Sequence, residues 1–230
     1  MGPGSPFPDY VKTNEIERTS LLHRFRAPRA SQFVHKAGCE SWTTAWAPDS
    51  SYLAWSSGNR IVRLIPWNRY KNKPVAEDDE DPDGHVLDLE ARRPLEIDTS
   101  ELVWALAFGS STCHHSQYGR QETRPDGSVR YRFNVAKDLI LATGLARGRI
   151  RLWDVLTGRQ LFELCDHLDV IRDMQFSPDG SMRLASASRD GTIKMWDIEE
   201  NGNMIKTLRR TSKWPYNCGF SPDAERLCGV

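Results

Sequence analysis

Several features that define other classes of protein are scarce or missing in this sequence of 230 residues. Lysine plus arginine and aspartate plus glutamate number 31 each, so no net charge attracts the chain to nucleic acid or to an anionic membrane. The five cysteines are far apart and include no Cys-x-x-Cys pair, which favours a reducing compartment over a disulfide framework. No run approaches the roughly 18 apolar residues of a membrane span, and the first residues lack the apolar core of a signal peptide. We therefore expect a protein of the cytoplasm, or of the nucleus.

Motifs for catalysis and for cofactor binding are also missing. The sequence contains no nucleophile elbow, no phosphate-binding loop and no set of metal ligands at a recognised spacing. Cys113, His114 and His115 are potential metal ligands, but side chains that are neighbours in sequence rarely converge on one ion. We therefore predict that the chain is not an enzyme and that it binds no cofactor or metal.

What the sequence does contain is an internal repeat. Phe-Ser-Pro-Asp at 176–179 returns at 220–223, which is 44 residues further on and matches the length of a propeller blade. Trp-Ala-Pro-Asp at 46–49 is an earlier copy, and Phe-Gly-Ser-Ser at 108–111 is a weaker one. Four units of strand and turn are therefore present.

A second motif shows how each unit continues. Residues 150–154 and 193–197 are alternating segments, 43 residues apart, and both end in Trp-Asp. These two repeats together are typical of the WD repeat, so we predict an all-β fold of the WD-repeat β-propeller type. One unit can be followed in order, as a strand at 170–176, a Pro-Asp-Gly turn, a strand at 184–188, a tight turn at 189–191 and a strand at 192–196.

Resemblance to WD repeats also implies a hydrogen-bonded network inside this third unit. The network joins a buried histidine, a turn aspartate, a strand hydroxyl and the tryptophan, and the residues at those positions are His167, Asp190, Trp196 and either Ser186 or Ser188. A polar group buried without a partner costs roughly 1 to 3 kcal/mol, so the members depend on one another. We therefore interpret His167 and Asp190 as structural residues and not as a catalytic dyad.

The other units depart from this pattern. In unit two Thr99 stands at the position of the histidine and Arg147 at that of the aspartate, while Thr143 and Trp153 keep the expected type. In unit four Thr211 stands at the histidine position. Only unit three is therefore expected to build the full network.

Two polar segments interrupt the repeat, and we expect both to be surface excursions. Residues 71–98 contain six acidic residues among the seven positions 77–83, which repel one another and indicate a solvated loop. A calcium site is the alternative, but the run lacks the glycine and the closing glutamate of an EF-hand loop. Residues 112–135 contain four arginines, which could contact phosphate or an acidic partner, but we interpret the segment as an exposed loop and predict no nucleic-acid site.

The repeats divide the chain into six parts. The last unit stops after its second strand, so about three and a half blades of a ring of seven or eight are expected, from a truncated product or from part of a longer chain. The parts are a partly disordered N-terminal extension at 1–34, a degenerate repeat 1 at 35–70, the acidic insertion at 71–98, repeat 2 at 99–165 with its insertion at 112–135, repeat 3 at 166–208 and a truncated repeat 4 at 209–230.

Several stretches are more specific than a general WD repeat. They resemble the WD repeat and SOCS box-containing proteins over about residues 35–230, and they include 42–49, 53–56, 62–67, 103–108, 141–145, 170–173, 186–190 and 201–204. The resemblance implies the substrate receptor of an elongin-cullin ubiquitin ligase, in which the propeller holds a target protein. A C-terminal SOCS box would bind elongins B and C and a cullin, and we expect none within these residues. The alternative is a general WD-repeat scaffold in another assembly.

The residues that contact the target are not evident from the sequence. Aromatic side chains on the loops of a propeller face are candidate anchors, and here these are Tyr52, Trp55, Trp104 and Trp214. Packing in the core is an equal alternative for each of them, because aromatic residues dominate both settings.

Overall fold

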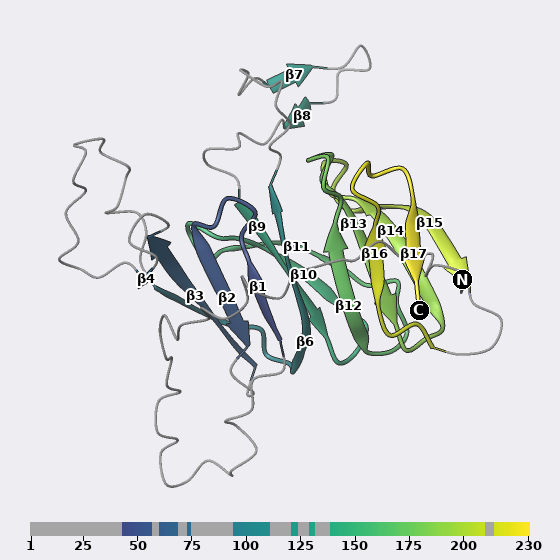
Figure 1. Ribbon diagram of the computed structural model, residues 1–230, viewed down its shortest axis with the longest axis horizontal. Coiled ribbons are helices and arrows are strands. Elements are labelled where there is room, and N and C mark those ends of the chain that lie inside the picture. The colour runs from purple at the N-terminus through teal and green to yellow at the C-terminus, as the bar shows by residue number, and fades with distance from the viewer. Residues whose placement is uncertain are drawn as a thin grey trace, which may run out of the picture.

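The computed structural model is all-β in the residues that it describes (Figure 1). Within this part of the chain no helix has the length and apolar character needed to cross a bilayer. The acidic positions 77–83, the Cys-His-His at 113–115, Thr211 and the extension at 1–34 lie outside the described residues. The structure describes residues 43–56, 60–68, 73–74, 94–110, 121–123, 129–131, 139–209 and 214–230.

The main strands form four antiparallel sheets that follow one another along the chain, as WD-repeat blades do. Blade 1 contains β1 (Thr44–Trp46), β2 (Tyr52–Ser56), β3 (Ile61–Asn68) and β5 (Leu95–Asp98). Blade 2 contains β6 (Val103–Ser110), β9 (Leu139–Leu145), β10 (Ile150–Asp154) and β11 (Gln160–Leu164). Blade 3 contains β12 (Ile171–Phe176), β13 (Arg183–Ser188), β14 (Thr192–Asp197) and β15 (Asn203–Arg209). Blade 4 is described as β16 (Cys218–Phe220) and β17 (Leu227–Gly229).

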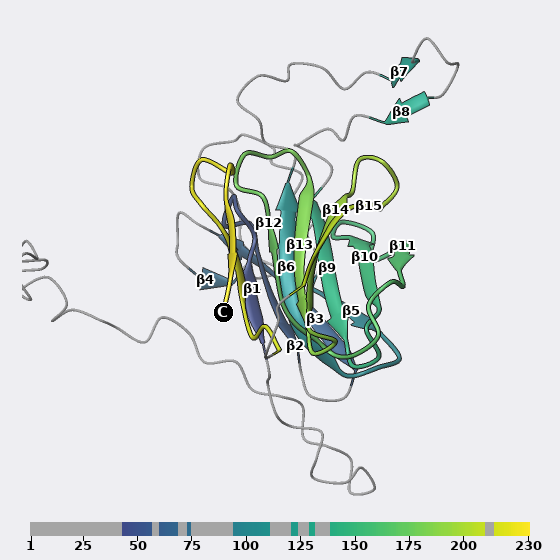
Figure 2. The same ribbon diagram turned by 90° about the vertical axis from the view of Figure 1, so that its right-hand side faces the viewer.

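The first strand of each blade lies beside the first strand of the next. β6 contacts both β1 and β12, and β12 contacts β16. Figure 1 shows this series from blue to yellow, and Figure 2 shows the sheets stacked face to face from the C-terminal side. The all-β fold and the blade architecture are therefore confirmed, while the number of blades in a closed ring remains a prediction.

The structure corrects the expectation that residues 71–98 are a surface excursion. Residues 95–98 form β5, the fourth strand of blade 1, in which Ile97 pairs with Val62 of β3. Leu95 and Ile97 alternate with two exposed acidic residues, which is the pattern of a strand with one buried face. A further short strand, β4 (Lys73–Pro74), pairs with the end of β3.

The insertion at 112–135 contains a hairpin outside the blades. Its strands are β7 (Gln121–Thr123) and β8 (Val129–Tyr131), which pair only with each other. Figure 1 shows the hairpin standing apart from the blade sheets. Since β6 ends at Ser110 and β9 begins at Leu139, the insertion leaves blade 2 between its first and second strands.

The repeated Pro-Asp sequence builds the same turn in three blades. The side chains of Asp49, Asp179 and Asp223 each accept a hydrogen bond from the backbone N–H two residues later, at 3.0, 2.9 and 3.1 Å. The residue between has a positive φ of 60°, 73° and 60° respectively, although only Gly180 is a glycine. The carboxylate holds the turn because it replaces a backbone acceptor, so a short sequence motif fixes the link between first and second strands.

Apolar side chains fill the spaces between neighbouring blades. Leu64 of blade 1 and Leu141 of blade 2 belong to one cluster, and Leu152 of blade 2 and Trp196 of blade 3 belong to the next. Two glycines allow blades 2 and 3 to approach closely. A Cβ atom at Gly109 would lie 2.5 Å from the ring of Phe176, and one at Gly144 would lie 2.6 Å from Cγ2 of Ile171.

Candidate functional site

Four of the five residues expected in the blade 3 network lie in one chain of hydrogen bonds. Nε1 of Trp196 donates to Oγ of Ser186 at 2.8 Å, and Ser186 Oγ lies 2.8 Å from Nε2 of His167. Nδ1 of His167 lies 2.7 Å from Oδ2 of Asp190. His167, Ser186 and Trp196 are all buried, so the chain connects the interior of the blade with the turn that holds Asp190.

The donors and acceptors of this chain fit a neutral histidine that carries its proton on Nδ1. Since Trp196 uses an acceptor site of Ser186, the hydroxyl hydrogen can point at Nε2, and Nδ1–H then donates to the carboxylate. Burial lowers the pKa of His167 below its usual value, although the Asp190 carboxylate opposes this effect. His167 is therefore neutral at pH 7, so its ring adds no positive charge to the surface of the blade.

Asp190 serves the turn as well as the histidine. Its Oδ1 accepts from the backbone N–H of Thr192 at 2.8 Å and from the hydroxyl of the same residue at 2.6 Å. Its Oδ2 also accepts from the backbone N–H of Leu168 at 3.0 Å. Burial raises the pKa of Asp190, but the hydrogen bonds from Thr192 and His167 outweigh burial and hold the pKa below its usual value.

Ser188 lies next to this chain but not in it. Its hydroxyl donates to the backbone oxygen of Asp169 at 2.8 Å and accepts from the backbone N–H of Asp190 at 3.1 Å. Of the two serines that the sequence left open, the structure places Ser186 between His167 and Trp196, and it places Ser188 at the turn. The two serines are two residues apart in β13, so their side chains point to the same face of the sheet. Ser188 ends the strand beside the turn, whereas Ser186 lies further inside the blade.

Blade 2 keeps only part of the arrangement. Nε1 of Trp153 donates to Oγ1 of Thr143 at 3.0 Å, as the tryptophan of blade 3 donates to its serine. Thr99 is buried at the histidine position, and its Oγ1 lies 2.8 Å both from the backbone oxygen of Arg60 in blade 1 and from that of Glu101, which leads into blade 2. The hydroxyl therefore links two blades, while Arg147, at the aspartate position, is exposed.

A cluster of ion pairs takes the place of the missing aspartate in blade 2. Arg149 pairs with Glu101, and it also reaches Glu163 at 3.4 Å, while Arg151 Nε lies 2.5 Å from Glu163. Arg151 also donates to the backbone oxygen of Thr99. The Glu101 carboxylate raises the pKa of Arg149. These side chains hold the start of β6 to the outer strands of the same blade.

The loops that lead into the first strand of each blade share one end of the stack with the turns between second and third strands. We call this end the entry face, and its described parts include residues 99–102, 146–149, 166–170, 189–191 and 214–216. Both insertions leave from strand ends at the opposite face, because they follow the first strand of blade 2 and the third strand of blade 1.

The four aromatic residues named as possible anchors are placed differently. Tyr52 is 2% exposed and belongs to the core between blades 1 and 2, so it is not a surface anchor. Trp55 is partly buried, with the guanidinium of Arg63 5.8 Å from its ring centroid. Trp104 and Trp214 lie on the entry face, and Trp214 is 48% exposed. Two of the four therefore remain candidates on this face.

Sequence reasoning missed the arginines that pack against these rings. The guanidinium carbon of Arg172 lies 5.1 Å from the ring centroid of Trp104 and 5.9 Å from that of Tyr216. That of Arg189 lies 4.7 Å from the ring centroid of Trp214. The contacts join blades 2, 3 and 4 through aromatic and cationic side chains.

A positional signal could have found three of these residues. Trp104, Arg172 and Tyr216 each stand four residues before a phenylalanine in the first strand of their blade. In β6 the pairing with β9 skips Trp104, and in β12 the pairing with β13 skips Arg172, so both are the extra residue of a β-bulge. A bulge redirects a side chain, which explains why equivalent residues of neighbouring blades meet.

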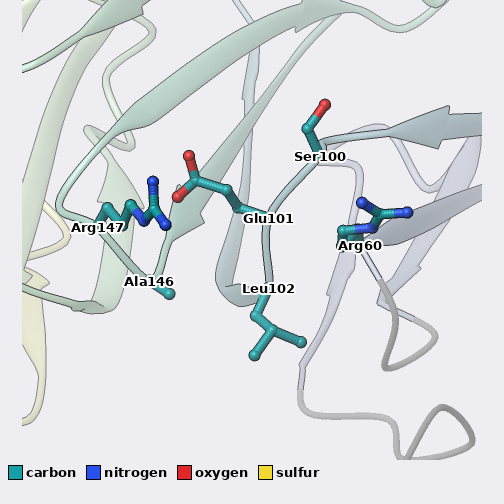
Figure 3. Close-up of a pocket in the computed structure, with 6 residues that line it drawn as sticks. All are labelled: Arg60, Ser100, Glu101, Leu102, Ala146 and Arg147. Carbon is teal, nitrogen blue, oxygen red and sulfur yellow. The ribbon is translucent and has the colours of Figure 1, made fainter. Parts of the chain in front are cut away.

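A pocket of about 530 Å³ lies on the same face between blades 1 and 2. Figure 3 shows Arg147 and Glu101 extending toward each other across it, with Arg60 on the far side of the segment that carries Glu101. Its lining combines charged and polar side chains with two apolar ones, so the pocket offers a mixed contact surface. The pocket is lined by Arg60, Ser100, Glu101, Leu102, Ala146 and Arg147.

Comparison with known proteins agrees with this architecture. The family model described as "WD domain, G-beta repeat" matches residues 158–197, which run from the outer strand of blade 2 through β14. WD repeat and SOCS box-containing protein 1 of Xenopus tropicalis is 44% identical over 97% of this chain, and its Homo sapiens counterpart is 42% identical over the same share. The chain spans about half of these relatives, 54% of each. The resemblance to the WD repeat and SOCS box-containing proteins is thus confirmed over nearly the whole chain, which is a WD-repeat chain related to that family.

Proposed function

We propose that this chain is the target-binding part of an elongin-cullin-SOCS-box ubiquitin ligase. The observation that carries the proposal is 42–44% identity, over 97% of the chain, to proteins named for both a WD repeat and a SOCS box. The chain is a protein-binding scaffold of WD repeats, and in this role it holds the protein that is to be modified. It performs no chemistry itself, and it acts in the cytoplasm or the nucleus.

The packing of the described blades suits such a receptor. The network around His167 and Asp190 fixes the turn at the entry face of blade 3, and the ion pairs of Arg149 fix the corresponding loops of blade 2. Rigid loops lose little conformational freedom when a partner docks, so more of the contact energy remains for binding. The same face carries half-exposed Trp214 and 62% exposed Tyr216, which are residue types enriched at interfaces.

The proposed partners divide between two parts of the longer protein. The WD repeats contact the target, while elongins B and C and the cullin bind the SOCS box of a form extended beyond these 230 residues. The proposal includes no cofactor. It also includes no nucleic acid or membrane, because the charge is balanced at 31 residues of each sign.

Co-purification tests the ligase role directly. An affinity-tagged form that extends through a SOCS box should capture elongins B and C and a cullin, whereas the 230-residue chain should capture none of them. Capture by the short chain would place the recruiting element within the blades and contradict the division of roles. Absence of capture by the extended form would overturn the ligase proposal.

A general WD-repeat scaffold is the second candidate. It is favoured by the fold alone, since propellers occur in many assemblies and the fold by itself specifies no partner. The two candidates differ in one measurement, because only the ligase receptor brings elongins with it when a bound target is isolated.

A further inference from the structure

We infer that the aromatic and arginine side chains of the entry face form a binding surface for an acidic, extended segment of a partner protein. The surface is defined here as the arginine–aromatic surface and consists of Trp104, Leu168, Arg172, Arg189, Trp214 and Tyr216. The inference rests on the proposed function as a protein-binding scaffold and names the class of segment that it binds.

The centre of the surface is Arg172, which packs between two rings. Its guanidinium carbon is 5.1 Å from the ring centroid of Trp104 in blade 2 and 5.9 Å from that of Tyr216 in blade 4. No carboxylate among the described residues pairs with it. Arginine stacked on aromatic rings uses the face of the guanidinium, so the N–H donors at its edge stay available to a carboxylate.

Arg189 is a second guanidinium on the same part of blade 3. Its backbone N–H donates to the backbone oxygen of Val170 at 2.9 Å. Arg189 therefore lies opposite Val170, which is two residues before Arg172 in the chain. It packs over Trp214, and its Nε lies 3.8 Å from Asp169, with both charged side chains more than two-fifths exposed. So loose and exposed a pair contributes little, and an incoming carboxylate can share Arg189 or replace Asp169.

Exposed apolar side chains border the two arginines. Leu168 is 88% exposed, Tyr216 is 62% exposed and Trp214 is 48% exposed. Isolated apolar residues on a surface need no explanation, but here three lie around stacked cations from successive blades. A partner with carboxylates alone would leave these side chains in water, whereas a segment that alternates acidic and apolar residues would cover both.

Two acidic side chains of this face are already engaged. Asp190 accepts from His167, Thr192 and Leu168, and Glu101 pairs with Arg149. Arg172 therefore depends on a carboxylate from outside the described residues for charge-assisted hydrogen bonds, which are the stronger class. Since the surface crosses from blade 2 to blade 4, an extended segment fits it better than a single charged group.

The probe is a fluorescein-labelled peptide that alternates glutamate with leucine. The comparison peptide is the same sequence with glutamine in place of glutamate. Fluorescence anisotropy measures the binding of each peptide to the full chain. The glutamate peptide should bind more tightly, by about fivefold or more, because its carboxylates reach the guanidinium edges. Its affinity should fall as salt is added, while that of the glutamine peptide should change little.

Variants locate the binding on the surface. Arg172→Gln and Arg189→Gln should each reduce the preference for glutamate by about threefold or more, because each removes one guanidinium. Trp214→Ala should weaken both peptides, since it removes apolar contact and not charge. Arg159→Gln is the matched control, because Arg159 is an exposed arginine in the turn between β10 and β11, outside the entry face. All four positions are partly or largely exposed, and equal unfolding temperatures will verify that each variant folds.

Three results would overturn the inference. They are equal affinity for the glutamate and glutamine peptides, absence of binding by the glutamate peptide, and an equal loss of preference in Arg159→Gln. Capture of elongins by a form with a SOCS box is an independent measurement, since Arg172→Gln and Arg189→Gln should leave that capture unchanged. Failure of capture therefore rejects the ligase role, and failure of peptide discrimination rejects this surface.

Discussion

Oδ2 of Asp190 lies 2.7 Å from Nδ1 of His167, although 23 residues separate them in the sequence. Asp190 sits in the turn between β13 and β14, while His167 lies in the segment that leads into β12. Their contact therefore closes the entry end of blade 3 and sets the position of Arg189 next to it. The stability of this blade and the shape of the entry face depend on the same hydrogen bond.

Asp190→Ala should destabilise the protein far more than Arg147→Ala, the change at the equivalent position of blade 2. The first change leaves His167 and the N–H groups of the turn without their acceptor, at a cost of roughly 1 to 3 kcal/mol. Arg147 is exposed, so its removal should cost about 0.5 kcal/mol or less. Urea unfolding curves of the two variants provide the comparison, and equal midpoints would contradict the network.

Acid should weaken the protein through His167. Because burial lowers its pKa in the folded state, the unfolded chain takes up a proton at a higher pH than the folded protein does. The stability contribution is complete above about pH 6.5, the usual value for histidine, and it decreases as the pH falls below that value. Asp190, whose folded pKa is also lowered, adds a further loss below about pH 4.

The unfolding temperature of the protein should therefore fall between pH 6.5 and pH 5. The unfolding temperature of the His167→Gln variant should fall less steeply over the same range. The other five histidines are common to both proteins, so the difference in slope belongs to His167. Parallel slopes in the two proteins would show that His167 titrates alike in the folded and unfolded chains.

Gly144→Ala should destabilise the contact between blades 2 and 3. The new methyl group would lie 2.6 Å from Cγ2 of Ile171 and 3.2 Å from Cβ of Ala105, so neighbouring strands must move apart. Overpacking of this kind costs roughly 1 to 3 kcal/mol. Gly219→Ala is the control, because its methyl group meets nothing closer than 3.6 Å, and its unfolding midpoint should stay near that of the parent. A similar loss of stability in both variants would mean that Gly144 is needed for backbone flexibility and not for the close approach of Ile171.

Removal of residues 77–83 should leave the unfolding temperature nearly unchanged. These positions carry six acidic residues, and they lie between the described ends of β4 and β5. Repulsion among like charges gives the segment no stabilising role in the blade. Differential scanning calorimetry of the shortened protein provides the check, and a fall of many degrees would show that the segment packs on the blades.

The sequence led to the right blades but to a wrong limit for blade 1. The repeated Pro-Asp turn and the Trp-Asp strand end were visible because each depends on a few adjacent residues. β5 was missed because a long acidic segment separates it from β3, and its four residues are a weak signal alone. The alternation of Leu95 and Ile97 with Glu96 and Asp98 was the evidence available, but only pairing with β3 makes it a strand of that blade.

The sequence by itself determined the repeat, the turns and the identity of the polar residues in blade 3, because these follow from local spacing and from the cost of burying unpaired groups. Only the tertiary structure decided that Ser186 joins His167 to Trp196, that Tyr52 is core, and that Arg172 lies between Trp104 and Tyr216. The contacts of Arg172 reach as far as Trp104, 68 positions away in the sequence, and they exist because β-bulges at Trp104 and Arg172 turn the side chains of successive blades toward one another.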